Sequence, residues 1–261
     1  MTLHFSKYQG TGNDFVIIDN RNKSLDKTNT KLVAHLCDRK FGIGADGCMF
    51  LEAGTNPNDD FTMVYFNADG NESTMCGNGG RCLVAFAKDL GIISDTATFT
   101  AIDGPHTATI ANGLVNLEMQ EVASIIAKPN HYWLDTGSPH HIEEVSGIET
   151  YDVFANGKRI RNGAPYFEKG TNVNFVEQIN DDTFKVRTFE RGVEDETLSC
   201  GTGVTAVAIA MYESGKTNAE KVNIETLGGL LTIRFRKEKA IYKVVHLEGP
   251  AKFVFKGTIE W

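Results

Sequence analysis

The sequence predicts an α+β fold built from two similar halves. Residues of alternating polarity recur along most of the chain, which is the pattern of half-buried strands. Two glycine-rich motifs, each containing a cysteine, precede apolar segments of helical length. Cys76 and Cys200 lie 124 positions apart (200 − 76), close to half of the 261 residues. We therefore expect two halves of one design, each with a cysteine where a helix begins.

Short runs with strand or helix character alternate along the chain. Asn112-Gly113, Asn156-Gly157 and Asn162-Gly163 are dipeptides typical of hairpin turns, so we expect antiparallel strands around them. The expected strands are Phe15 to Asp19, Phe61 to Phe66, Thr107 to Ile110, Leu114 to Met119, Asn172 to Val176, Phe184 to Phe189, Leu230 to Arg236 and Tyr242 to Leu247. The expected helices are Thr30 to Cys37, Gly79 to Leu90, Tyr151 to Asn156 and Gly203 to Ser214. Apolar periodicity lapses near Lys128, where the halves are expected to divide.

Composition limits the classes of protein to which the chain can belong. The hydrophobic content of 41% is enough for a large core. The net charge of −8 and the lack of a clear Lys/Arg cluster argue against a nucleic-acid partner. No apolar run approaches the ~20 residues that cross a bilayer, and the first ten residues do not resemble a secretion signal. We expect a cytoplasmic protein without a membrane partner.

The five cysteines are expected to be thiols. They are odd in number and scattered, which is not the pattern of a disulfide scaffold. Neither a CxxC pair nor a His/Cys group with metal-ligand spacing occurs, so we expect no metal site. Cys37, Cys48 and Cys82 have no special context and are expected in the core.

The setting of Cys76 and Cys200 suits proton transfer at carbon. A helix N-terminus lowers the pKa of a thiol, because the peptide dipoles and unpaired N–H groups favour the thiolate. The adjacent glycines let a substrate carboxylate approach those N–H groups, which can also stabilise enolate-like charge. Inverting a stereocentre without a cofactor requires a base on one face and an acid on the other. Two matched cysteines meet that requirement.

Other interpretations of the two motifs are open. The run from Cys76 to Arg81 could cradle a phosphate, although it lacks the Walker pattern. A cysteine hydrolase with His140 or His141 as the base would leave the second cysteine without a role. A third interpretation is a redox or binding protein in which Cys76 and Cys200 form a reversible disulfide.

Four segments resemble, in order, the motifs of the diaminopimelate epimerase family. They are Gly10-Thr11-Gly12-Asn13-Asp14-Phe15, Phe66-Asn67-Ala68-Asp69-Gly70, Cys76-Gly77-Asn78-Gly79, and Glu190-Arg191-Gly192 with Glu196 to Gly203. The resemblance spans nearly the whole chain. It implies two pseudo-symmetric α+β domains, each a barrel-like sheet around a central helix, with the active site in the cleft between them. The domains expected are 1–121 with 250–261, because the last strand returns to the first domain in that family, and 122–249.

The resemblance also implies roles for individual residues. Cys76 and Cys200 would be the catalytic pair. The reacting end of the substrate would be held by Gly77, Asn78, Gly201 and Thr202, and the distal end by Asn13, Asn67, Asn172, Glu190 and Arg191. Glu190 and Arg191 offer an anion for an ammonium and a cation for a carboxylate. Asn78 stands where the related proline racemases typically have His, and phenazine-type isomerases lack the cysteine pair, so both features favour the diaminopimelate branch.

Two residues depart from the family pattern. Many members have Asn at the position of Ser138, and some have Gln at the position of Gly47. Ser138 still forms hydrogen bonds but is shorter, so distal contacts can be rearranged. His140 either supports the cysteines or only packs beside them. The expected activity is interconversion of LL- and meso-diaminopimelate without a cofactor, by a homodimer. The alternative within the same chemistry is racemisation of another amino acid.

Overall fold

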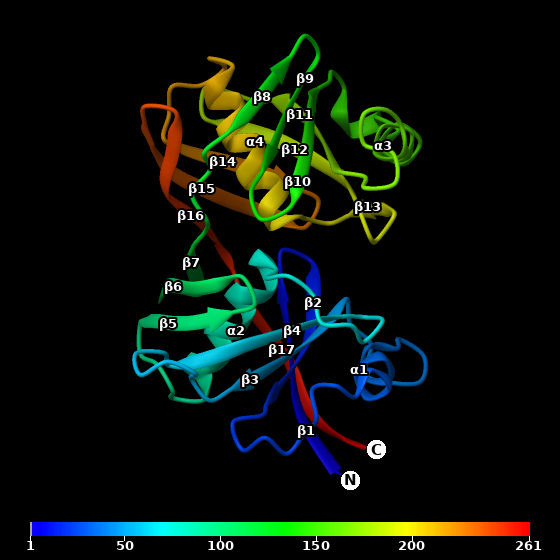
Figure 1. Ribbon diagram of the computed structural model, residues 1–261, viewed down its shortest axis with the longest axis vertical. Helices are drawn as coiled ribbons and strands as arrows, with labels where there is room; N and C mark the ends of the chain where they lie inside the picture. The colour runs from blue at the N-terminus through cyan, green and yellow to red at the C-terminus, as the bar shows by residue number, and fades with distance from the viewer. Residues whose placement is uncertain (1) are drawn as a thin grey trace. The chain divides into compact units, whose positions relative to one another are not determined.

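The computed structural model describes residues 2–261, which form two compact units (Figure 1). The first unit runs to Leu117 and also contains Gly249–Trp261, and the second comprises Glu118–Glu248. These divisions lie four residues before the boundary expected after 121 and one residue before the one expected at 250. The chain therefore leaves the first unit once and returns to it at its end.

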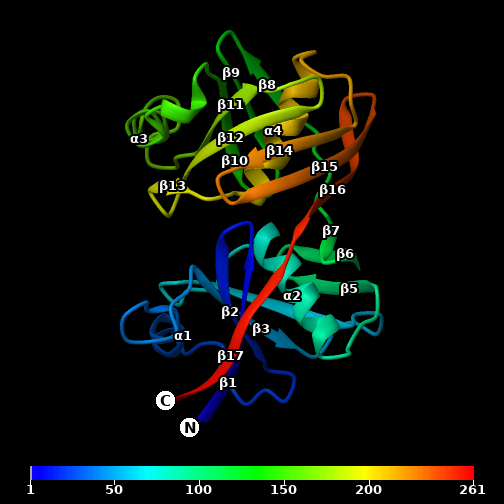
Figure 2. The ribbon, with the colours of Figure 1, turned by 180° about the vertical axis from the view of Figure 1, so that it is seen from behind.

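The first unit is a sheet wrapped around one buried helix. Strand β2 pairs antiparallel with β1 and parallel with β3, and antiparallel β3–β4 is followed by parallel β4–β5. The C-terminal strand β17 runs antiparallel beside β1, as Figures 1 and 2 both show. The elements are β1 (Thr2–Gly10), β2 (Asn13–Asp19), α1 (Thr30–Cys37), β3 (Gly47–Glu52), β4 (Phe61–Asn67), α2 (Gly77–Asp89), β5 (Thr96–Ala101), β6 (Gly104–Ala111), β7 (Leu114–Glu118) and β17 (Lys252–Glu260).

The second unit wraps its strands around α4 in the same way (Figure 2). Strand β10 pairs antiparallel with β9 and parallel with β11, and antiparallel β11–β12 is followed by parallel β12–β14. The elements are β8 (Ile125–Lys128), β9 (His131–Asp135), β10 (Pro139–Glu144), η1 (Ile148–Thr150), α3 (Val153–Asn162), β11 (Asn172–Gln178), β12 (Thr183–Glu190), β13 (Asp195–Thr197), α4 (Gly201–Glu213), β14 (Lys221–Thr226), β15 (Gly229–Glu238) and β16 (Ile241–Pro250).

The pairing order shows that the two units share one plan. In each, a parallel pair flanks the first helix and a second parallel pair flanks the central helix. Phe15 pairs with Gly47 at the start of β3, and His140 pairs with Asn172 at the start of β11. By this register Asn13 corresponds to Ser138. Both Asn13 and Asn172 lead into apolar strands in the sequence, but they are not structurally equivalent.

The central helices are apolar because strands enclose them. Residues Gly77–Ala87 of α2 are all buried, and so are ten of the thirteen residues of α4. In α4 this burial matches an almost wholly apolar sequence, whereas α2 also buries the polar side chains of Asn78 and Arg81. Cys37, Cys48 and Cys82 are buried in the first unit, as expected. Within residues 2–261, no helix combines the length and apolar character needed to cross a membrane.

Three sequence expectations need correction: the turns at Asn156-Gly157 and Asn162-Gly163, and the helix Tyr151 to Asn156, which in the structure is α3 (Val153–Asn162). The dipeptide Asn156-Gly157 is no turn but lies inside α3, which continues to Asn162. Gly157 is needed there for packing, since a Cβ would lie 2.3 Å from the Cβ of Phe189. Gly163 follows Asn162 at the end of this helix rather than in a hairpin. Asn112-Gly113 does join β6 to β7, with φ of 51° and 76°.

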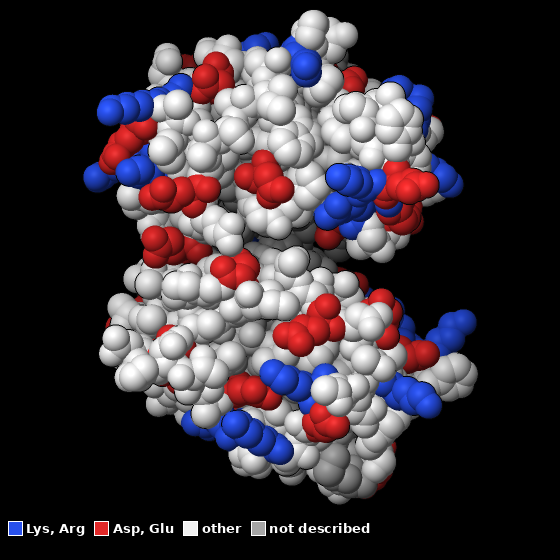
Figure 3. All heavy atoms as spheres, viewed as in Figure 1, with Lys and Arg blue, Asp and Glu red and all other residues white. Residues whose placement is uncertain are grey.

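Charged side chains of both signs are interspersed on the viewed face of each unit (Figure 3). The viewed face shows no extended basic tract. Ion pairs of the second unit include Arg187 with Glu196 at 2.6 Å and Arg161 with Glu194 at 2.8 Å.

The second unit buries one histidine completely, and this predicts a dependence of stability on pH. Burial, with a smaller effect of Arg191, lowers the pKa of His140 from 6.5 to about 3. Between these values the unfolded chain binds a proton that the native protein does not. The free energy of unfolding should therefore fall as pH decreases below about 6.5, by at most about 1.4 kcal/mol per pH unit for this group.

Urea unfolding between pH 7 and pH 4 tests this expectation. The stability of wild type should decrease more steeply with acidity than that of His140→Gln, because the variant lacks the titrating group. His4→Gln, at an exposed position of β1, should keep the wild-type slope. Equal slopes for wild type and His140→Gln would show that His140 does not take up a proton on unfolding.

Candidate active site

Cys76 is the N-cap residue of α2, so its sulfur lies where the helix dipole is positive. The helix begins at Gly77, two residues earlier than expected. The N–H groups of its first turn have no partner within the helix. The exposed fraction of Cys76 is intermediate, whereas Cys82, farther along the same helix, is fully buried. One helix terminus thus provides both a thiol and donors for an anion.

A chain of side-chain amides runs past the sulfur of Cys76. Nη2 of Arg81 donates to Oδ1 of Asn78 at 3.0 Å, and Nδ2 of Asn78 donates to Oδ1 of Asn13 at 3.3 Å. The same Oδ1 of Asn13 lies 4.0 Å from Sγ of Cys76. Each amide is oriented by its partners, because one end faces a donor and the other an acceptor. We call Cys76, Thr11, Asn13, Asn78 and Arg81 the Cys76 cluster.

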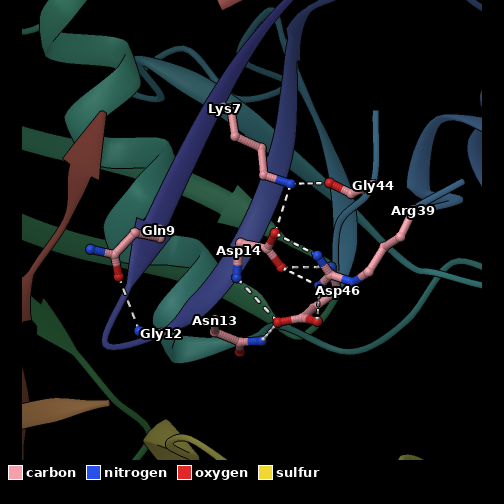
Figure 4. A network of polar contacts seen from close by, with 8 residues as sticks. All are labelled: Lys7, Gln9, Gly12, Asn13, Asp14, Arg39, Gly44 and Asp46. Carbon is pink, nitrogen blue, oxygen red and sulfur yellow. Dashed lines mark hydrogen bonds and ion pairs between the residues drawn. The ribbon is translucent and has the colours of Figure 1, made fainter. Parts of the chain in front are cut away.

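A network of two acids and two cations fixes the turn that carries Asn13 (Figure 4). Asp46 accepts a hydrogen bond from Nδ2 of Asn13 at 2.6 Å and also binds Arg39. Asp14 binds Lys7 at 2.8 Å and Arg39 at 2.7 Å. Burial alone would raise the pKa of Asp14, but the hydrogen bonds from Arg39 and Lys7 lower it to about 2. Asp14 is therefore ionised at neutral pH, and the network joins two acidic with two basic side chains.

Arg81 is the largest fully buried side chain of the protein. Its Nη1 lies 3.4 Å from the carbonyl oxygen of Gly77, and its Nη2 donates to Thr11 at 3.1 Å. Within residues 2–261 no acidic side chain forms an ion pair with Arg81, and its Nε has no hydrogen-bond partner. Burial lowers the pKa of Arg81 to about 10, so the guanidinium is charged at neutral pH.

Cys200 occupies the equivalent position in the second unit. It is the N-cap residue of α4, which begins at Gly201, and it is 8% exposed. Its Sγ lies 3.4 Å from Oγ1 of Thr202. This hydroxyl lies 3.0 Å from Nε2 of His140 and 3.2 Å from Oγ of Ser138. We call Cys200, Thr202, Ser138, His140 and Asn174 the Cys200 cluster.

Asn174 determines which nitrogen of His140 carries the proton. Nδ2 of Asn174 donates to the carbonyl oxygen of His141 at 3.1 Å, so this end of the amide is the donor. The same Nδ2 lies 3.1 Å from Nδ1 of His140, which must then accept. The remaining proton is on Nε2 and points to the hydroxyls of Ser138 and Thr202. His140 is thus a neutral donor and not a base for Cys200.

The residues predicted for the distal end of the substrate are partly connected to the Cys200 cluster. Asn172 is buried, donates to Oγ of Ser138 at 3.1 Å and accepts from the backbone N–H of Arg191 at 2.9 Å. The guanidinium of Arg191 is exposed and donates to the carbonyl oxygen of Lys169 at 3.0 Å. Ser138 therefore connects the distal residues to His140 and Thr202.

Three further predicted residues lie at the ends of strands. Asn67 ends β4 and is exposed, and Glu190 ends β12 and is partly buried. Gly47 begins β3, where a Cβ would lie 2.7 Å from both the Tyr65 ring and the Phe66 carbonyl oxygen. A larger residue at Gly47 would therefore require Tyr65 to move.

Three polar residues in or next to the two clusters were not assigned roles from the sequence. Asp46, Arg81 and Asn174 each orient a side chain that was predicted. A signal was present for Arg81, because it is the only charged residue in the buried part of α2. Within residues 2–261 no group of three or more His, Cys, Asp or Glu side chains has an arrangement that could hold a metal ion.

Comparison with known proteins identifies relatives of the whole chain. The family model for diaminopimelate epimerase matches residues 5–124 and 132–254. The chain is 53% identical over 254 residues to diaminopimelate epimerase of Flavobacterium psychrophilum, covering 97% of this chain and 98% of the relative. It is 41% identical to the enzyme of Chlorobaculum tepidum, with coverage of 96% and 98%.

Solved structures confirm the fold class. A phenazine biosynthesis protein of the PhzF family from Bacillus anthracis has a TM-score of 0.77 at 14% identity, with complete coverage of both chains. A probable proline racemase from Agrobacterium radiobacter has a TM-score of 0.70 at 14% identity, covering 99% of this chain and 93% of that one. These similarities concern the fold alone, whereas the family match and the close relatives extend over nearly all of the sequence. The chain belongs to the diaminopimelate epimerase family.

Proposed function

We propose that the protein interconverts LL- and meso-diaminopimelate by means of Cys76 and Cys200. The observation that carries this proposal is the duplicated arrangement of a cysteine as N-cap residue of a buried central helix. The family match and the named relatives support the substrate. The chemistry uses a thiolate that removes the α-proton and a thiol that donates a proton to the opposite face.

The helix termini supply what the developing negative charge needs. The first-turn N–H groups at Gly77, Asn78, Gly201 and Thr202 can donate to the carboxylate at the reacting carbon. The same bonds strengthen as the α-carbon loses its proton and charge moves onto the carboxylate oxygens. After each turnover the roles of the two sulfurs are exchanged, so the reverse reaction uses the same groups. The proposal includes no cofactor and no metal.

The distal end of the substrate is assigned to side chains around the two clusters. We propose that Asn13, Asn67, Asn172, Glu190 and Arg191 hold its ammonium and carboxylate groups. Ser138 shares hydrogen bonds with Asn172 and His140, so its shorter side chain still connects distal and reacting ends. The partner is thus a small amino acid, not a nucleic acid or a membrane. We place the protein in the cytoplasm, since five cysteines outside any disulfide suit a reducing compartment.

Deuterium incorporation in heavy water tests the catalytic pair. Wild type should incorporate solvent deuterium at the α-carbon and epimerise LL-diaminopimelate. Cys76→Ser and Cys200→Ser should each lower the rate of epimerisation by at least about 100-fold, because one acid–base group is lost. Cys37→Ala, at a buried position in α1, should retain activity.

Full epimerisation by either serine variant would exclude the two-cysteine mechanism. The same assay with single-centre amino acids such as glutamate tests the substrate. Faster turnover of those than of LL-diaminopimelate would show that the protein is a racemase of another amino acid.

Two equivalent glycines provide a matched test of the clusters. A Cβ on Gly203 would lie 2.4 Å from Oδ1 of Asn174, whereas one on Gly79 would lie 3.1 Å from the flexible thioether sulfur of Met49. Gly203→Ala should therefore displace Asn174, release His140 and lower both kcat and stability, the latter by about 1–3 kcal/mol. Gly79→Ala should have a smaller effect on stability. Similar urea midpoints for the two variants would show that Asn174 yields to a methyl group as easily as Met49 does.

The family resemblance implies a homodimer, and we propose one through the sheet of the first unit. Phe253, Val254 and Phe255 on β17 are each about half exposed, at 49%, 50% and 45%. Sedimentation equilibrium should show a dimer that Val254→Lys weakens. Leu230→Lys, at an exposed apolar residue of the second unit, should leave the dimer intact. A wild-type monomer at micromolar concentration would refute the proposed assembly.

A further inference from the structure

The two clusters differ in charge although they share one plan. Five positions after Cys76 stands Arg81, and five positions after Cys200 stands Thr205. Both side chains are fully buried and both contact the carbonyl oxygen of the residue after the cysteine. Nη1 of Arg81 lies 3.4 Å from the carbonyl oxygen of Gly77. Oγ1 of Thr205 donates to the carbonyl oxygen of Gly201 at 2.9 Å. The first unit therefore has a cation where the second has a neutral hydroxyl.

The charge of Arg81 is not cancelled by its own neighbours. Its hydrogen-bond partners are the hydroxyl of Thr11, the amide of Asn78 and the carbonyl of Gly77, which are all neutral. Arg81 contacts the first turn that follows Cys76: its Nη1 lies 3.4 Å from the carbonyl oxygen of Gly77, and its Nη2 donates to Asn78, whose amide donates to the Asn13 oxygen that lies 4.0 Å from Sγ of Cys76. The guanidinium also interacts electrostatically with the thiols of Cys82 and Cys76. Burial raises the pKa of Cys82 to about 12, so this thiol stays protonated. Cys76 is thus the group beside Arg81 that is able to become an anion.

The other charges on the elements packed against α2 do not replace Arg81. Lys7, Arg39, Asp14 and Asp46 form the network of Figure 4. Solvent screens the exposed charges of the preceding loop and of β17. Other charged or titratable groups on these elements are paired or exposed: Tyr8 with Asp89, Asp19 with Arg21, Lys88 with Asp95, His106 with Asp103, Glu52 with Asn20, and exposed His4, Asp69, Glu72, Lys252, Lys256 and Glu260. Burial raises the pKa of Cys48 on β3, so this thiol stays protonated.

We propose that Arg81 is a positioning residue whose buried charge holds Cys76 as the thiolate of the resting enzyme, while Cys200 rests as the thiol. The proposal rests on the proposed function and assigns unequal resting states to its two cysteines. A buried opposite charge nearby shifts a pKa by about one to three units. At the position equivalent to Arg81, the Cys200 cluster is joined by the neutral Thr205, and Cys200 contacts the hydroxyl of Thr202 and, through it, His140. Arg81 also orients the amide of Asn78, which is a predicted carboxylate-binding residue.

Thiol titration of the free enzyme tests this assignment without any substrate. The full chain is alkylated with trace iodoacetamide at pH 5 to 10, and mass spectrometry gives the rate at each cysteine. The midpoint for Cys76 should lie at least about one pH unit below that for Cys200, which is a tenfold difference in thiolate fraction at pH well below both midpoints. A midpoint for Cys200 at or below that of Cys76 would overturn the proposal, whatever the variants do.

Variants at Arg81 and at the equivalent Thr205 then test whether the charge of Arg81 lowers the pKa of Cys76. Arg81→Gln should raise the Cys76 midpoint by at least about one pH unit and leave the Cys200 midpoint unchanged. Arg81→Lys, which keeps the charge, should leave the Cys76 midpoint within about half a unit of wild type. Thr205→Val removes the equivalent contact in α4 and should shift neither midpoint. A folded Arg81→Gln with an unchanged Cys76 midpoint would refute the role of Arg81. Epimerase activity is measured separately, so a failure of the proposed function is distinguishable from a failure of this assignment.

Discussion

Both clusters depend on the close approach of one strand to the first turn of a buried helix. In the first unit Gly79 of α2 faces Met49 of β3, and in the second Gly203 of α4 faces Asn174 of β11. A Cβ at Gly203 would lie only 2.4 Å from Oδ1 of Asn174 and would push the helix away from the strand, whereas one at Gly79 would meet the flexible thioether of Met49 at 3.1 Å. The approach fixes the first turn, and with it the sulfur and the N–H groups beside it. The glycines of the two cysteine motifs are thus packing constraints that make an anion site available.

The register of the two parallel pairs makes the halves comparable residue by residue. Asn13 corresponds to Ser138, and Asn78 corresponds to Thr202. Asn13 contacts Asn78 in the first unit, and Ser138 contacts Thr202 in the second. The side chains nevertheless differ in kind. Amides form the chain next to Cys76, while hydroxyls and an imidazole form the chain next to Cys200. One backbone plan therefore supports two different polar environments beside the two cysteines.

The sequence predicted the features that depend on local pattern. The two cysteine motifs predicted helix starts to within two residues, and alternation located strands such as β12 and β16. Long-range contacts were not predictable in this way. Asn156-Gly157 has the local signature of a turn, but Phe189, 32 positions away, packs on Gly157 inside a helix. Asp46, in the segment that precedes β3, orients Asn13, and nothing in the sequence around Asn13 indicates this partner.

A buried cation without an acidic partner is a costly feature in a protein core. Desolvation of a charge costs several kcal/mol, and hydrogen bonds donated to neutral acceptors recover only part of that. An apolar residue would fit the interior of α2 without this cost. The cost is offset when an anion forms next to the cation, and the thiolate of Cys76 is such an anion. Arg81 is therefore more stable in the state in which Cys76 is ionised, and the same free-energy difference favours that ionisation. The desolvation cost of Arg81 and the ionisation of the Cys76 thiol are therefore thermodynamically linked.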